Sequence, residues 1–433
     1  MKRQDLKWGV LSALAVMFVL AMVVFLGAPV GADSSLCSTP YLSYLSNSSY
    51  CAIQPETYYG KPYLTWQGNP STTMTINSHT AERPAVVVVQ YDTASAQKEY
   101  GFSATGESWQ IPGLKDGRFI NSVEITGLTP GQTYYFRLGD NTEFSEEYKF
   151  RTIPDGNESI RFAIGGDSLA TPAFGELISN VAAQSPNFLV IGGDLAYANG
   201  DVEQIDQWNN WLGRWHKNAL TPEGYLIPMV MALGNHETND SEGSFEERAP
   251  FFYGFFPQGG KTFWSHQFGA NLGFIILDSG HLVSHEEQVP WLEEQLKSFV
   301  SLPFRVAAYH VPLYPSHRDF EGGGSIAGRE HWLPLFDAHQ LAVGFEHHDH
   351  TFKRTKRLRN NEVNPEGTLY VGDGSAGVMS RDPKEGLWYM EKVARDSHFW
   401  IVDVSDSEMH LRAINRSGVF FDEATIAVPS MPK

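Results

Sequence analysis

The chain of 433 residues is 42% hydrophobic and 19% charged, as expected of a globular protein, and it is too long for one simple domain. Its formal net charge of −18 at pH 7 argues against nucleic-acid binding, which needs a basic stripe. An anionic substrate would therefore need local positive charge, which bound metal ions could supply.

The first 32 residues have the character of an export segment. Lys2, Arg3 and Lys7 precede a stretch, residues 8–32, that has no charged residue. This pattern predicts either a signal peptide cleaved after a small-residue Val-Gly-Ala site or a retained membrane anchor, since about 20 apolar residues span a bilayer. A cytosolic core helix is the alternative. The basic flank places the rest of the chain outside the cytoplasm, as a periplasmic or extracellular protein that is secreted or anchored by this N-terminal segment.

Residues 33–56 form a leader with little periodicity, and it contains the only two cysteines, Cys37 and Cys51. In an exported chain such a pair is expected to form one local disulfide. The alternative is two unpaired buried thiols. Neither cysteine lies near the candidate site in sequence, so no thiol chemistry is expected.

Residues 57–154 carry short β-rich runs separated by Gly, Pro, Asp and Asn: TMTINSHT, AVVVVQY, SVEITGL, TYYFRLG and EEYKFRT. This cadence predicts an all-β antiparallel sandwich domain. In GLTPGQTYYFRL, a Pro-Gly turn precedes Tyr134 and resembles the tyrosine corner of fibronectin-III-like sandwiches. A plain β-turn before a strand is the alternative.

Residues 155–428 alternate apolar strands with amphipathic helical patterns. Strands are expected in IRFAIGGD, FLVIGGD, YLIPMVMALGNH, LGFIILDSG, FRVAAYH, QLAVGFEHH, GTLYVGDG, FWIVDV and MHLRAI. Helices are expected in AFGELISNVAAQ, VEQIDQWNNWLGRWHKNAL and HEEQVPWLEEQLKSF, and the Gly-rich stretch 320–328 is expected to be a mobile loop at a rim. The alternation predicts an α/β domain with helices on both faces of a sheet.

Five short islands at the ends of apolar runs carry oxygen and nitrogen donors: GGDSLA (165–170), GGDLAY (192–197), GNHE (234–237), AAYH (307–310) and HHDH (347–350). An α/β sheet presents ligands to a cleft at the carboxyl ends of its strands. The candidate donors are Asp167, Asp194, Tyr197, Asn235, His310, His348 and His350. Seven donors are too many for one zinc-type ion and suit a two-metal cluster that shares one carboxylate.

The series of islands resembles the calcineurin-like metallophosphoesterases, and in detail the purple acid phosphatases. Tyr197 stands three residues after Asp194, matching the family's Asp-x-x-Tyr, and a predicted sandwich precedes the catalytic part. The resemblance covers nearly everything from about residue 61 onward. It implies a layered α/β metallophosphoesterase domain of sheets and helices, preceded by an all-β fibronectin-III-like domain.

The resemblance also implies a role for each donor in a binuclear centre. A ferric ion would be bound by Asp167, Tyr197 and His350, and a divalent ion (iron, zinc or manganese) by Asn235, His310 and His348. Asp194 would bridge both ions. His236 would face the substrate phosphate, and His317 is the best match to an outer histidine that acts as general acid.

The implied function is an exported binuclear metal-dependent acid phosphatase. It would hydrolyse phosphate monoesters of small phosphorylated substrates by attack of a metal-activated hydroxide. A phosphodiesterase or nucleotide-directed metallophosphoesterase has the same ligand set and is the alternative. A non-catalytic adhesion or binding protein would have lost ligands, yet all seven positions are filled. The sequence gives no oligomeric state.

Two positions depart from the family pattern. Leu169 stands where the family usually has a Gly two places after the first Asp, and Glu346-His347 stands where it usually has a Gly before His-x-His. The first departure is expected to alter a turn and the second to reshape the pocket floor.

Some residues outside the donor set have simpler interpretations. Trp208, Trp211 and Trp215 lie at helical spacing and are expected to pack in the core. His281 and His285 flank a loop and a helix start, which predicts capping or solvation. Lys353-Arg354 and Lys356-Arg357 follow the last island, and either attraction of an anionic substrate or a solvated strand face would explain them.

Overall fold

The computed structural model of the chain describes residues 60–95 and 99–428. The expected export segment 1–32, the expected leader 33–56 and both cysteines lie outside these residues. All the described residues belong to one compact unit by contacts. Within the described residues no helix is long and apolar enough to cross a membrane.

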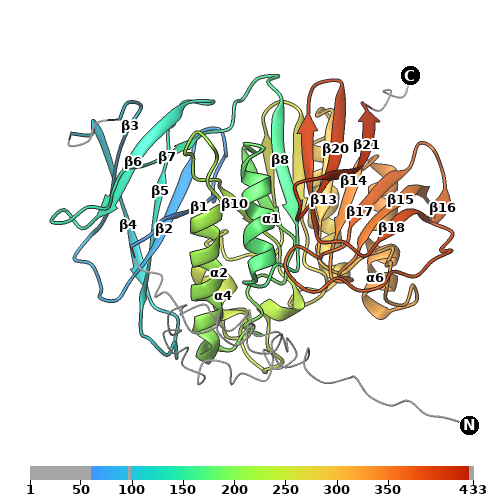
Figure 1. Cartoon of the computed structure of the whole chain (residues 1–433), viewed down its shortest axis with the longest axis horizontal. Coiled ribbons are helices and arrows are strands. Elements are labelled where there is room, and N and C mark those ends of the chain that lie inside the picture. The colour runs from blue at the N-terminus through green and yellow to red at the C-terminus, as the bar shows by residue number, and fades with distance from the viewer. Residues whose placement is uncertain (1–59, 96–98, 429–433) are drawn as a thin grey trace, which may run out of the picture. The chain divides into compact units, whose positions relative to one another are not determined.

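The N-terminal part of the described chain is a seven-stranded antiparallel sheet in the order β1-β2-β5-β4-β3-β6-β7 (Figure 1). Its strands are β1 (Tyr63–Thr65), β2 (Met74–Thr80), β3 (Val87–Asp92), β4 (Phe102–Trp109), β5 (Phe119–Ile125), β6 (Thr133–Gly139) and β7 (Tyr148–Arg151). The first half of β4 pairs with β3 and its last three residues pair with β5, so this strand joins the two halves of the sheet. The predicted all-β part is confirmed.

Tyr134 on β6 forms the predicted corner. Its hydroxyl oxygen accepts a hydrogen bond at 2.9 Å from the backbone N–H of Thr129, in the preceding turn. The ring is buried and stacks on Phe150. This corner fixes the turn that leads into β6.

The C-terminal part contains two further sheets. The six-stranded sheet has the order β10-β9-β8-β19-β20-β21, with β8 (Ile160–Gly165), β9 (Phe188–Ile191), β10 (Met229–Met231), β19 (His398–Val404), β20 (Glu408–Asn415) and β21 (Phe420–Ala427). The eight-stranded sheet has the order β11-β12-β13-β14-β17-β15-β16, with β18 paired to β15. Its strands are β11 (Trp264–Phe268), β12 (Leu272–Ile276), β13 (Phe304–Ala308), β14 (Val343–Glu346), β15 (Phe352–Arg359), β16 (Glu362–Val363), β17 (Thr368–Gly372) and β18 (Met390–Ala394).

The two sheets share one apolar interface. Phe162 of β8 stacks on Phe188 of β9 and meets Phe274 of β12 edge-on, at centroid distances of 5.2 and 5.4 Å. These rings belong to one continuous core cluster that also includes Trp66 after β1. The sequence predicted one sheet with both faces covered. The structure instead has two sheets face to face. Strands β9 and β12 are buried at every residue, because one face of each strand packs in the core between the sheets and the opposite face packs against helices. A continuous apolar run does not show which kind of layer covers each face.

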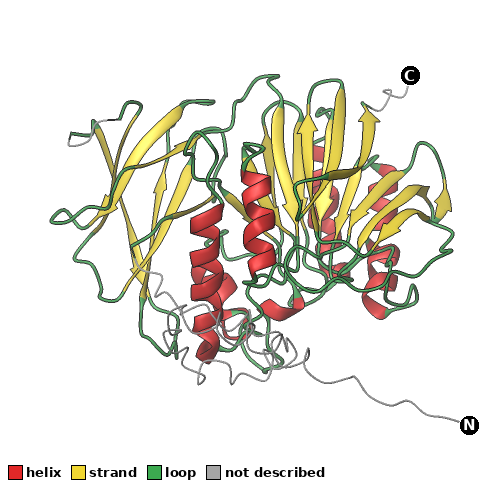
Figure 2. Cartoon of the chain, viewed as in Figure 1, coloured by secondary structure: helices red, strands yellow, loops and turns green. Residues whose placement is uncertain are grey.

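Helices cover the outer face of each sheet (Figure 2). They are α1 (Pro172–Ala182), α2 (Ile205–Asn218), α3 (Phe245–Arg248), α4 (Pro250–Phe255), α5 (His285–Ser298), α6 (Gly323–His331) and α7 (Leu333–Ala338), with short 3₁₀ turns η4 (Val202–Gln204) and η5 (Asn235–Glu237). Helices α1, α2 and α4 share an apolar cluster with the six-stranded sheet, and α5 and α7 share one with the eight-stranded sheet. Helix α6 packs against α5 and α7. The predicted α/β class is confirmed, and Trp208, Trp211 and Trp215 are core residues of α2 as expected.

The expectation of a loop over residues 320–328 was wrong for most of the stretch. Helix α6 begins at Gly323 despite its run of glycines. Arg329 anchors it by donating to the carbonyl oxygens of Leu313 and Phe320, and its guanidinium lies 3.6 Å above the Phe320 ring. Tertiary contacts therefore override the weak helix propensity of glycine.

Candidate metal centre

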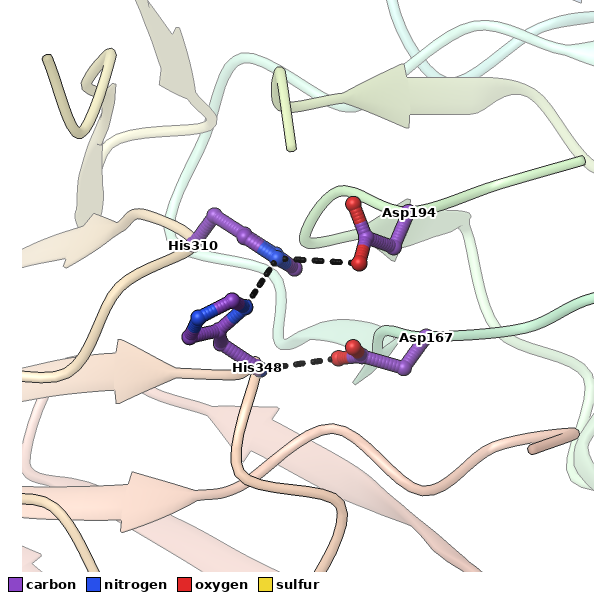
Figure 3. Close-up of side chains that lie close together, drawn as sticks. All are labelled: Asp167, Asp194, His310 and His348. Atoms are coloured by element: carbon purple, nitrogen blue, oxygen red, sulfur yellow. Dashed lines mark hydrogen bonds and ion pairs between the residues drawn. The ribbon is translucent and has the colours of Figure 1, made fainter. Parts of the chain in front are cut away.

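The five islands lie at the carboxyl ends of parallel strands. Strands β8, β9 and β10 run parallel in one sheet, and β12, β13, β14 and β17 run parallel in the other. Figure 3 shows Asp167, Asp194, His310 and His348 pointing toward one another from four of these strand ends. One ligand atom from each lies within 4.8 Å of the others, so these four groups could hold a metal ion.

Asp167, Tyr197 and His350 form one group of three donors. Asp167 Oδ1 lies 2.9 Å from His350 Nε2 and 3.4 Å from the Tyr197 hydroxyl, and the hydroxyl lies 3.5 Å from His350 Nε2. The other oxygen of Asp167 accepts the backbone N–H of His348 at 2.9 Å. The distances within the group are those between neighbouring ligands around one ion whose bonds are about 2.0–2.2 Å long.

Asn235, His310 and His348 form the second group. His310 Nε2 lies 3.2 Å from Asn235 Oδ1 and 3.0 Å from His348 Nδ1. Asp194 Oδ2 lies 3.2 Å from the same nitrogen. Asp194 Oδ1 accepts the backbone N–H of His236 at 2.8 Å.

The second group fits a cation at the position where its donors meet. His310 Nδ1 donates to the carbonyl oxygen of Gly192 at 2.9 Å, so the neutral ring presents a lone pair at Nε2. That lone pair faces the oxygens of Asp194 and Asn235. Burial alone would lower the pKa of His310, but the Asp194 and Asp167 carboxylates raise it to about 9. His310 in turn holds the pKa of the buried Asp194 well below its usual range. The group therefore requires positive charge, from a proton or a metal ion.

The backbone at the donors is strained. Of the seven predicted donors, five have positive φ angles between 54° and 75°: Asp167, Asp194, Tyr197, His348 and His350. Non-glycine residues in this region cost about 1–3 kcal/mol each and cluster at functional sites. Leu169 also has a positive φ of 37°, at the position where the family usually has glycine. The first island therefore keeps a turn that suits glycine while carrying a leucine.

Two positions around the donors have space only for a glycine. A Cβ at Gly374, which has φ +68°, would lie 1.8 Å from Asp167 Oδ2. A Cβ at Gly192 would lie 1.9 Å from the ring of His347. His347 thus packs beneath the β9 turn, and burial lowers its pKa well below the usual value. Gly374 follows β17 and was not recognised from the sequence as part of the site.

Glu237 is a second residue whose role the sequence did not indicate, although it lies in the island of residues 234–237. Its buried carboxylate accepts three backbone N–H groups, from Asp194 at 2.7 Å, Leu195 at 2.7 Å and Gly234 at 2.9 Å. Burial and the Asp194 charge raise the pKa of Glu237 to about 8, against the opposing effect of these hydrogen bonds. Glu237 therefore ties the turn after β9 to the turn after β10.

His236 lies beside both groups and does not belong to either. Its Nε2 is 3.9 Å from Asp194 Oδ2, and its ring lies on that of Tyr197 at 4.2 Å. Nδ1 donates to Asn199 Oδ1, and the Asn199 N–H donates to the His236 carbonyl oxygen at 2.9 Å. Asn199 thus holds both the ring and the backbone of His236 and leaves Nε2 toward the site.

His317 has different neighbours. Its Nδ1 donates to the Asp382 carbonyl oxygen at 2.8 Å, and its backbone N–H donates to Asp349. Among the described residues, no recorded contact joins its ring to the donor groups. By contrast His281, which we expected to be a capping or solvated residue, lies with its ring 5.8 Å from that of His310.

A buried charged network supports the last island. The Lys353 ammonium is fully buried and pairs with Glu346 and Asp373, so neither interpretation of this lysine from the sequence was right. Glu346 also accepts from the Tyr309 hydroxyl and the Leu313 N–H, at 2.8 and 2.7 Å. The bulkier residue before His-x-His therefore anchors the strand end to the segment that follows His310.

The family models match both parts of the chain. Residues 60–152 match the purple acid phosphatase N-terminal domain, and residues 161–352 match the calcineurin-like phosphoesterase domain. The fold and the site thus define a calcineurin-like phosphoesterase domain behind an all-β domain. More particularly, the chain belongs to the purple acid phosphatase family.

Individual relatives agree with this family. Purple acid phosphatase 15 of Arabidopsis thaliana is 28% identical over 294 residues, which are 60% of this chain and 53% of that protein. Acid phosphatase type 7 of Mus musculus is 23% identical over 415 residues, 85% of this chain and 90% of that protein. The chain thus spans about half the length of the Arabidopsis relative. A purple acid phosphatase from yellow lupin seeds shares the fold, with a TM-score of 0.73 at 20% identity over 84% of this chain and 74% of that one.

Proposed function

We propose that the chain is a metal-dependent phosphatase that hydrolyses phosphate monoesters of small substrates at a binuclear centre. The observation that carries the proposal is the pair of three-donor groups, one around Asp167 and one around His310, with Asp194 adjoining both. A single ion would leave the donor atoms of one group without a cation to bind. Two ions that share Asp194 would use all seven donors.

The first group would hold a ferric ion and the second a divalent ion, which we propose to be iron, zinc or manganese. A phenolate and a carboxylate are hard anionic ligands and suit a trivalent ion, whereas two imidazoles and an amide suit a divalent one. When bound, the ions would supply a water of lowered pKa and would offset the charge of the phosphoryl oxygens.

The side chains around the donors would bind and orient the ester. His236 Nε2 is held toward the site by Asn199, so it is placed to contact a phosphate oxygen. Glu237 holds the Asp194 turn in place without facing the substrate. The general-acid role for His317 stays a prediction, and it requires the ring to leave Asp382.

Hydrolysis of two model esters tests the proposal. The full chain should hydrolyse para-nitrophenyl phosphate much faster than bis-para-nitrophenyl phosphate, and Asp194→Asn should abolish the reaction. Asp406→Asn, in an exposed turn, is the matched control and should keep full activity. Faster cleavage of the diester would favour a phosphodiesterase. Full activity in Asp194→Asn would refute the bridging role.

We also propose that the chain is exported, on the charge pattern of residues 1–32. Mass spectrometry of the protein from its native host tests this, since cleavage near residue 32 would leave a mature chain that begins at about Asp33. An uncleaved chain recovered in the membrane fraction would favour the anchor, and an uncleaved cytosolic chain would contradict export.

A further inference from the structure

His281 has an imidazole for which the fold gives no hydrogen-bond partner. Neither of its ring nitrogens bonds to any described residue, and Nε2 is buried. A buried polar atom left without a partner costs about 1–3 kcal/mol, so such an atom needs an explanation. A ligand that the protein binds would provide one.

The loop that carries His281 is firmly held. The Asp278 carboxylate accepts the backbone N–H of His281 at 2.8 Å and those of the next two residues at 3.2 and 3.1 Å. Arg248 donates to the His281 carbonyl oxygen at 2.9 Å. The Ser279 hydroxyl accepts the N–H of Val311, the residue after His310, at 2.9 Å. The imidazole is therefore carried by a loop that hydrogen bonds hold in place, one of them to the segment that contains His310.

His281 lies next to the second donor group. Its ring centroid lies 5.8 Å from that of His310, and the two rings are tilted by 56°. His281 also interacts electrostatically with Asp194 and His236. It does not belong to the four residues whose ligand atoms lie within 4.8 Å of one another. The imidazole therefore lies beside the second donor group without belonging to it.

We propose that His281 contacts the phosphate group of the substrate on the His310 side of the centre. This inference rests on the proposed function and adds a substrate contact to it. His317 does not occupy this place, because its ring bonds to Asp382. A neutral imidazole donates one hydrogen bond, and a hydrogen bond to a charged group contributes enough to change affinity at least tenfold.

His281→Phe keeps the ring and removes both nitrogens, so it isolates the hydrogen bond. We expect KM for para-nitrophenyl phosphate and the competitive inhibition constant of inorganic phosphate both to rise about tenfold or more. The metal content per chain should equal that of the wild type. The matched control is His285→Phe. Like His281, His285 has a buried Nε2 that has no hydrogen-bond partner among the residues the structure describes, and it packs under Gly280 of the same loop, but its ring lies against Trp332. This control should leave both constants unchanged.

The outcomes separate this inference from the proposed function. A wild-type chain that neither hydrolyses the ester nor binds phosphate would refute the proposed function, and this inference with it. An active wild type with unchanged constants in His281→Phe would refute this inference alone. Equal changes in both variants would show a packing effect. Loss of metal from His281→Phe would show that His281 is a metal ligand. Either result would overturn the substrate contact.

Discussion

The backbone N–H of Asp194 donates a 2.7 Å hydrogen bond to Glu237, a carboxylate that also accepts from Leu195 and Gly234. One buried side chain thus joins the turns after two neighbouring strands, each of which carries donors. Because Asp194 has a left-handed backbone, this anchor helps to offset the strain at the donor proposed to bridge the metals. The ligand geometry is held by the protein before a metal binds.

Glu237→Gln should weaken both the fold and the metal site. A glutamine amide has one acceptor oxygen, so its NH₂ would face a backbone N–H that now donates to Glu237. We expect the free energy of unfolding of the metal-free chain to fall by about 1–3 kcal/mol, with a lower metal content after purification. Urea denaturation and elemental analysis measure these effects. Glu246→Gln on the surface is the control, and equal behaviour of the two variants would contradict the anchoring role.

The left-handed backbone of Leu169 predicts an unusual order of stability between two small substitutions. Leu169→Ala and Leu169→Gly both remove the buried side chain, but only glycine accepts φ +37° without steric cost. We expect the glycine variant to be more stable than the alanine variant by about 1 kcal/mol in thermal or urea unfolding. The reverse order, which is usual elsewhere in a fold, would show that the leucine turn is unstrained.

Lys353→Met should destabilise the chain strongly. It would leave Glu346 and Asp373 buried without their cation, and breaking a buried ion pair costs about 3–5 kcal/mol. Lys356→Met, three residues along the same strand, should cost little, because Lys356 is half-buried and its ammonium donates to the Trp388 carbonyl oxygen rather than to a buried carboxylate. Urea denaturation of the two variants makes the comparison. Similar small losses would mean that the buried network contributes little to the fold.

Buried histidines should make the metal-free chain lose stability on acidification. Burial lowers the pKa of His398 and of His285 to about 4, whereas the unfolded chain has the ordinary value of about 6.5. Between these values the unfolded state binds more protons, so the free energy of unfolding falls as pH falls from about 6.5 to 4, by up to about 1.4 kcal/mol per pH unit for each group. His398→Gln should reduce this slope in urea titrations at several pH values. An unchanged slope would contradict the assignment of a neutral buried imidazole.

Tyr197→Phe tests the ferric assignment. Tyr197 lies 3.4 Å from Asp167 Oδ1 within the first donor group, so a ferric ion held there would have a phenolate ligand. The purified wild type should show a visible tyrosinate-to-iron charge-transfer band, and the variant should lack it. Tyr309→Phe is a control of the same substitution outside the donor groups and should keep the band. A wild type with no such band would exclude the ferric ion at Tyr197.

The donors were predictable because each follows a short apolar strand, and parallel strands bring their carboxyl ends to one edge. The residues that support the donors were not predictable, because their roles depend on contacts between segments that are distant in the sequence. Nothing in the sequence shows that Glu237 would reach back to Asp194, or that the loop of His281 would bond to the residue after His310. Helix α6 was not predicted because a run of glycines favours a loop when only the local sequence is considered.

Elemental analysis of the purified full chain tests the central claim most directly. Because we propose that Asp194 bridges the two donor groups, we predict two metal ions per chain, one of them iron. Turnover of para-nitrophenyl phosphate should be lost when the ions are removed and regained when they return. A chain that holds no more than one ion while fully active, or that stays active after complete removal of metal, would contradict the binuclear centre.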